Sequence, residues 1–166
     1  MKKAVGVLFM LTFVIWGAYR MVANIQFGQD CEGHLKRAAD ANTIELAKGE
    51  LEVALGYLED NRMTEGYTSI VYETPDEDVE FWHKNLTASL QELKDLSPDV
   101  SGLERSNMLI KLRETLLDES GNRTTVTYPS GMSVFPNNTS VALLGFITGI
   151  LALVGGILFL RDFSAY

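Results

Sequence analysis

The sequence predicts an all-α fold in which two transmembrane helices flank an extracytoplasmic, antiparallel three-helix bundle. An apolar stretch lies at each end of the chain, and apolar residues recur at helical spacing between them. Two helix-start motifs interrupt the middle segment. An extended segment or small hairpin is expected to return the chain from the bundle to the membrane.

The C-terminal apolar stretch, residues 141–160, contains no charged residue. As an α-helix it would span about 30 Å, the thickness of the hydrocarbon core of a bilayer. Gly145, Gly149, Gly155 and Gly156 lie within it. Because small residues let membrane helices approach closely, we expect these glycines to pack this helix against the N-terminal span or against a second copy of the chain.

The N-terminal apolar stretch, residues 4–26, follows Lys2 and Lys3 and contains one ionisable residue, Arg20. A cleavable signal peptide would have a similar beginning, but bulky residues stand where a peptidase requires small ones. We therefore expect an uncleaved signal anchor that forms the first transmembrane helix. The near absence of ionisable residues in both spans argues against an ion or proton path within one chain.

The charges at the two ends of the chain predict its orientation. Short basic tails stay in the cytoplasm, so residues 1–3 and 161–166 are expected there. Residues 27–139 would then lie outside the inner membrane of a bacterium, in the periplasm or the extracellular space.

The middle segment is strongly acidic. Residues 27–139 contain 21 Asp and Glu against 10 Lys and Arg, in a chain of net charge −8. Such a surface should repel nucleic acid and anionic lipid headgroups and attract a basic partner. Cys31 is the only cysteine, which excludes an intramolecular disulfide and any cysteine-pair metal or redox motif.

Apolar spacing and helix-start motifs predict the helices of this segment. No proline precedes Glu59, so the first span is expected to continue as one helix to that point. Thr74 to Glu77, with a proline at the first helical position, match a capping box that begins a helix ending at Ser97-Pro98. A second box at Ser101 to Glu104 predicts a third helix that ends at Gly121.

The apolar stripes of these helices define the expected core. Its members are Leu51, Leu55, Val79, Trp82, Leu86, Leu90, Leu93, Ile110 and Leu117. Between residues 123 and 135, Val126 and Tyr128 alternate with threonines before Pro129-Ser130-Gly131. That pattern predicts extended chain, with a small hairpin around the proline and glycine.

Glu80 and His83 form a Glu-x-x-His pattern, which places two ligands on one face of a helix in di-iron bundles. Such a site needs further ligands, and the other histidine, His34, is expected at the opposite end of the bundle. We therefore predict no metal site and no cofactor. Glu80 and His83 are the only candidates for metal ligands. No set of nucleophile, base and orienting residue can be assembled either, so the protein is predicted to be non-catalytic.

The predicted arrangement of span, helical bundle and span resembles the front half of a chemoreceptor, in topology alone. The short tails would not hold an output module, so a partner would have to supply one. The expected function is therefore a membrane-anchored interaction protein, scaffold or accessory subunit of a bacterial envelope complex. Its expected partners are the lipid bilayer and another protein or further copies of itself. The alternative is a ligand-sensing accessory protein with a small molecule bound in the bundle.

Overall fold

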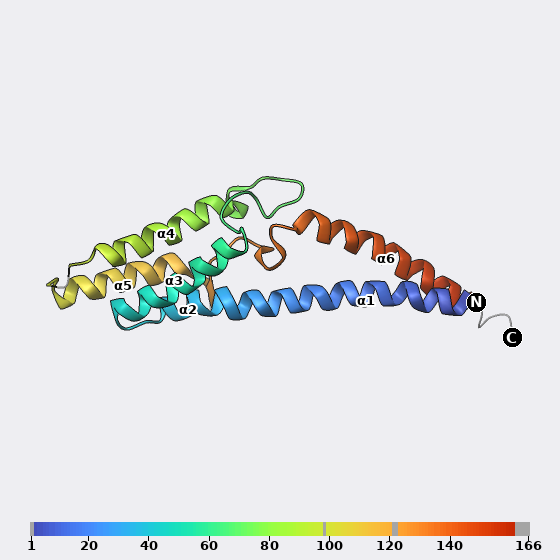
Figure 1. Cartoon of the computed structure of the whole chain (residues 1–166), viewed down its shortest axis with the longest axis horizontal. Helices are drawn as coiled ribbons and strands as arrows, with labels where there is room; N and C mark the ends of the chain where they lie inside the picture. Colours follow the sequence, from blue (N-terminus) through green and yellow to red (C-terminus); the bar gives the residue numbers. More distant parts are fainter. Residues whose placement is uncertain (1, 98, 121–122, 162–166) are drawn as a thin grey trace. The chain divides into compact units, whose positions relative to one another are not determined.

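The computed structural model describes residues 2–97, 99–120 and 123–161 (Figure 1). Residue 1, residue 98, residues 121–122 and the tail beyond Arg161 lie outside the described residues. Two of these positions, Pro98 and Gly121, are those at which the sequence predicts the end of a helix. The chain divides into an apolar unit, Met1–Ile25 with Asn137–Tyr166, and an acidic unit, Gln26–Pro136. Both units are mainly helical.

The apolar unit consists of helix α6, Asn138–Arg161, and of helix α1, Lys2–Phe27, except for the last two residues of α1, which belong to the acidic unit. Both helices are long and apolar enough to cross a membrane. Their large side chains are mostly uncovered by protein; Ile15 is 67% exposed and Leu153 is 72% exposed. Two continuous apolar surfaces of this kind suit the interior of a bilayer, where helices satisfy their own backbone hydrogen bonds.

The acidic unit contains four helical segments that run in alternating directions (Figure 1). They are α2, Gly33–Ala39; α3, Ile44–Asp60; α4, Val79–Asp95; and α5, Gly102–Leu116. A π-helical turn, Gly28–Glu32, joins the end of α1 to α2. All four segments contribute to one buried cluster.

The predicted continuous helix through Glu59 is wrong, because it ends at Ala39 and a new helix begins at Ile44. Thr43 has extended backbone angles, and its side-chain oxygen accepts a hydrogen bond from the amide of Leu46 at 3.3 Å. An N-cap of this kind satisfies a backbone donor at the start of the new helix. Helix α3 therefore folds back against α2, and the described part of the acidic unit contains four α-helices, α2 to α5, instead of the predicted three.

The start of α4 also differs from the prediction. Thr74 and Glu77 do pair, through their side chains at 2.6 Å, but they belong to a separate 3₁₀ turn, Pro75–Glu77, for which Thr74 is the N-cap. The N-cap of α4 is Asp78, whose carboxylate accepts a hydrogen bond from the amide of Phe81 at 3.0 Å. The motif thus marks the right region, four residues before the helix itself begins.

The expected core residues are buried, with one exception. Ile110 is 54% exposed. Helix α5 instead buries Leu112 and Leu116, with Leu109 partly covered. Ile110 lies two residues from Leu112, which is about 200° around an α-helix, so both cannot face the core. The other expected core residue of this region, Leu117, is buried at the start of a strand and not in a helix.

A long loop connects α3 to α4 and folds against the start of α4. Gly66 adopts a φ of +99°, a conformation that favours glycine, and its carbonyl accepts a hydrogen bond from the amide of Val79 at 2.9 Å. The amide of Thr68 donates to the carbonyl of Glu77 at 3.1 Å. The apolar residues 70–72 of this loop are exposed.

The return segment contains a hairpin, but earlier in the chain than predicted. Strand β1, Leu117–Ser120, pairs antiparallel with β2, Arg123–Val126. Helix α5 therefore ends several residues before Gly121. Residues 129–131 do not connect two strands; instead, Gly131 at a φ of +87° leads into a 3₁₀ turn, Met132–Val134.

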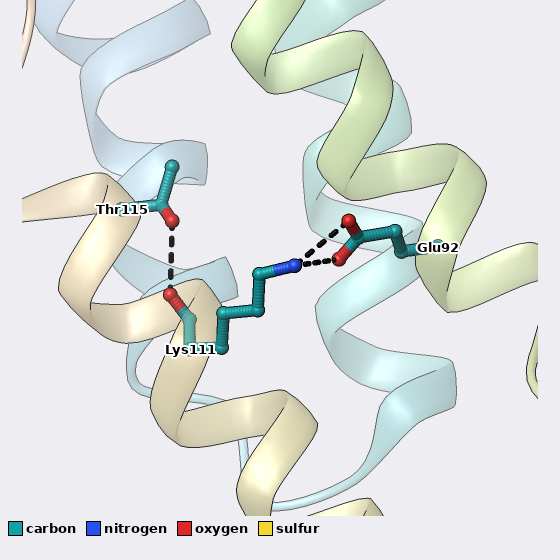
Figure 2. A network of polar contacts seen from close by, with 3 residues as sticks. All are labelled: Glu92, Lys111 and Thr115. Atoms are coloured by element: carbon teal, nitrogen blue, oxygen red, sulfur yellow. Dashed lines mark hydrogen bonds and ion pairs between the residues drawn. The ribbon is translucent and has the colours of Figure 1, made fainter.

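Surface ion pairs connect neighbouring helices of the acidic unit. The ammonium group of Lys111 on α5 lies 2.6 and 2.8 Å from the two carboxylate oxygens of Glu92 on α4 (Figure 2). In the same view, the hydroxyl of Thr115 donates to the carbonyl of Lys111 at 2.9 Å. Arg113 similarly reaches Asp40, at the end of α2, at 2.7 Å. Because these pairs are exposed, each stabilises the fold by about 1 kcal/mol at most.

The adjacent residues Trp82 and Phe81 give a matched test of the core. Trp82 is 8% exposed and Phe81 is 63% exposed. We expect Trp82→Ala to lower the free energy of unfolding by about 3–5 kcal/mol. Phe81→Ala should change it by about 0.5 kcal/mol or less. Chemical denaturation of the full chain in a mild detergent, followed by circular dichroism, measures both values; similar losses in the two variants would contradict the assigned core.

Candidate functional site

The residues predicted as metal candidates do not form a metal centre with others. The Glu80 carboxylate pairs with the ammonium group of Lys84, one turn later on α4. The Nε2 atom of His83 is buried and has no hydrogen-bond partner among the described residues. Within those residues, no group of three or more His, Cys, Asp or Glu side chains lies close enough to hold a metal ion.

The second histidine, His34, takes part in a polar contact between two helices of the acidic unit. Nδ1 of His34 on α2 lies 2.6 Å from the carboxylate of Glu50 on α3, and Arg37 pairs with the same carboxylate. Glu50 is largely covered, so these contacts join α2 to α3 at the side of the core. One turn before His34, Cys31 is fully buried. His34 and Arg37 thus connect α2 to α3, and the Cys31 thiol lies in the core.

The four predicted packing glycines of α6 have different environments. A Cβ atom on Gly155 would lie 2.5 Å from the carbonyl oxygen of Gly6 on α1. Gly145 lies against the indole ring of Trp16, and a Cβ atom on Gly149 would lie 3.8 Å from the ring of Phe13. These three glycines therefore pack against the other helix of the same chain.

Gly156 is the exception, because a Cβ atom there would meet no atom within 4 Å. A polar contact accompanies the close packing of the other three: the indole nitrogen of Trp16 donates to the carbonyl of Val141 at 2.8 Å. Within this chain, three of the four glycines therefore lie against α1, which is one of the two partners that the sequence left open.

A pocket beside the start of α4 has the most distinctive chemistry of the acidic unit. It lies between that helix, the junction of α5 with β1, and the segment after β2, and it encloses about 450 Å³. Its lining residues are Pro75, Asp76, Asp78, Phe81, Trp82, Asn85, Leu86, Thr115, Asp118, Thr127, Tyr128 and Pro129. We call it the acidic-aromatic pocket. Its volume is within the range of small-molecule sites.

Hydrogen bonds fix two aromatic side chains of the acidic-aromatic pocket. The indole nitrogen of Trp82 donates to the carbonyl of Thr127 at 2.9 Å. The hydroxyl of Tyr128 donates to the carboxylate of Glu32 at 3.2 Å, and its ring meets Phe27 edge to face at 5.1 Å. Burial and the neighbouring Glu32 carboxylate raise the pKa of Tyr128, so its hydroxyl keeps its proton. These two side chains are held in place before any ligand arrives.

Only part of this pocket could be predicted from the sequence. Trp82 and Leu86 were expected in the core, and Tyr128 in extended chain. Asp76 lies within the predicted capping box, but its place in a pocket with Asp118 was not predicted, because the two residues are separated by more than forty positions. Only the fold brings the 3₁₀ turn and β1 to the same pocket.

Adjacent glycines allow a test of the packing in the apolar unit. We expect Gly155→Leu to separate α1 from α6, since its side chain would meet the backbone of Gly6. Gly156→Leu adds the same bulk at a site with open space and serves as the control. Fluorescence energy transfer between labels at the two helices, measured in lipid nanodiscs, should fall for the first variant only. Equal behaviour of the two variants would refute the close contact.

His83 should make the stability of the acidic unit depend on pH. Burial lowers its pKa below the ordinary value of 6.5, and the nearby Glu59 opposes this only in part. The unfolded chain therefore binds a proton more readily than the folded chain. The resulting stability is fully present above about pH 6.5 and is lost as the pH falls towards the lower folded-state pKa.

Denaturation of the full chain in detergent between about pH 5.5 and 7.5 measures this effect, since histidine titrates in that range. The His83→Gln variant should show a flatter dependence than the original chain, because its side chain does not titrate. An identical slope for both proteins would mean that His83 is not responsible.

Comparison of the chain with protein-family models, with curated proteins and with solved structures finds no match. What the protein does is therefore inferred from its own geometry, burial and charge.

Proposed function

We propose that this protein is a membrane-anchored, non-catalytic accessory subunit of a bacterial envelope complex. In this proposal α1 and α6 cross the inner membrane, both termini are cytoplasmic, and the acidic unit lies on the opposite side. The acidic unit then recruits or holds a partner protein, or a further copy of the chain.

The observation that carries the proposal is the contrast between the two units. Helices α1 and α6 expose apolar side chains over their whole length, whereas the acidic unit encloses its own core. An apolar pair of helices would aggregate in water and is stable in lipid. Basic residues at the start of α1 and at the end of α6 favour a cytoplasmic location for both tails.

The charge of the acidic unit supports a binding role. Its ion pairs use lysines and arginines that connect one helix to another, such as Lys94 with Glu52 and Lys111 with Glu92. With about twice as many acidic as basic residues in this segment, a large negative excess remains at the surface. Such a surface accelerates association with a basic partner and weakens association with nucleic acid.

The second candidate function is ligand sensing, and the acidic-aromatic pocket favours it. The pocket encloses about 450 Å³ and has fixed aromatic residues and several carboxylates in its lining. A protein of this kind would bind a small molecule and pass the signal to a partner.

Chemical cross-linking of intact spheroplasts tests the main proposal. A membrane-impermeant amine-reactive cross-linker reaches lysines such as Lys84 only if the acidic unit lies outside the inner membrane. We expect it to produce one species of defined larger mass that contains this chain. Prior incubation at about 0.5 M salt should reduce the yield of that species, since salt screens attraction between exposed charges.

A membrane-permeant cross-linker of the same length is the matched control. A defined product with the permeant reagent alone would contradict the proposed orientation. If neither reagent yields a product of defined mass, the proposed role as a subunit of a complex is wrong.

A further inference from the structure

We propose that the acidic-aromatic pocket binds a small organic cation, an ammonium or guanidinium group on a short apolar body. The inference rests on the second candidate function and names the chemical class of its ligand. It also holds if the protein is at the same time a subunit of a larger complex.

The charges of the pocket select for a cation. Asp76, Asp78 and Asp118 belong to its lining, which contains no lysine and no arginine. The other pockets described in this structure each include at least one basic residue: Lys48, Lys94, Arg105 or Arg113. A concave wall that carries one sign of charge concentrates ions of the opposite sign, so this pocket attracts cations. The basic residues of the other pockets oppose such an attraction.

The aromatic residues distinguish an organic cation from a metal ion. Phe81, Trp82 and Tyr128 belong to the same lining. Aromatic faces attract ammonium and guanidinium groups, and aromatic cages recognise quaternary ammonium ligands in this way. The three carboxylates, in contrast, do not form a set close enough to coordinate a metal among the residues described. The combination of aromatic rings with separated carboxylates therefore fits a small organic cation with an ammonium or guanidinium group.

The pocket is also preorganised. Trp82 is held by the carbonyl of Thr127 and Tyr128 by the carboxylate of Glu32, at 2.9 and 3.2 Å. Asp78 is held by its capping bond to the amide of Phe81. Because these side chains are already ordered, binding loses little conformational entropy. Asp76 and Asp118, at the exposed rim, are free to approach the charge of the ligand.

Isothermal titration of the full chain in detergent tests the proposal with defined probes. Choline and agmatine present a quaternary ammonium group and a guanidinium group, and 3,3-dimethylbutan-1-ol is the neutral counterpart of choline. We expect at least one of the two cations to bind about tenfold or more tightly than the neutral alcohol. If neither choline nor agmatine binds more tightly than the alcohol, the proposal is overturned.

Matched variants locate the binding site. Asp118→Asn and Phe81→Leu should each weaken cation binding about fivefold to tenfold, and neither replaces a buried side chain. Glu114→Gln, one turn before Asp118 and outside this pocket, makes the same change of charge and should leave binding unchanged. Asp78 is kept in every variant because it caps α4. Equal weakening by Glu114→Gln would show that a diffuse acidic surface binds the cation and would overturn the assignment to the pocket.

A short Gly-Lys-Gly peptide with blocked ends distinguishes a free ligand from a basic side chain of a protein partner. Binding of the peptide without binding of choline or agmatine would overturn the small-molecule assignment. Failure of all probes leaves the cross-linking result unaffected, so the failure of this inference and that of the membrane-anchored role are distinguishable.

Discussion

The reversal of the chain between Asp40 and Thr43 is the constraint on which the acidic unit depends. The segment α2 is only seven residues long and cannot form a core alone. By folding back, α3 packs against α2, and its Ala47 and Ala54 join Leu35 of α2 in one buried cluster. Helix α4 packs against α3 and helix α5 against α2, so all four helices contribute to that cluster.

The same packing shapes the candidate site. The indole of Trp82 belongs to the core of α4 and also donates a hydrogen bond to the segment that follows β2. Tyr128, in that segment, donates a hydrogen bond to Glu32, and its ring packs edge to face against Phe27 at the end of α1. Contacts that close the core thus also position the aromatic residues of the pocket, so its geometry depends on the fold and not on a flexible loop.

The apolar unit is stabilised by a different interaction. In the proposed membrane location, burial away from water does not drive the two helices together, so close packing has to replace it. The mutual approach of Gly6 and Gly155, and the fit of Trp16 against Gly145, provide that packing between α1 and α6. Exposed apolar side chains elsewhere on the two helices remain available to lipid or to other membrane helices.

The sequence by itself determined the features that depend on composition and on the period of one helix: two apolar spans, an acidic middle segment, and the buried stripe of α4 around Trp82. It did not determine where the first long helix stops, although Asp40-Ala41-Asn42-Thr43 is a typical turn composition. Local propensity allows helix on both sides of that turn, and only packing of α3 against α2 favours the reversal. Tertiary structure likewise decided that Leu112 and not Ile110 faces the core, and that aspartates distant in sequence share one pocket, because both outcomes depend on which surfaces meet.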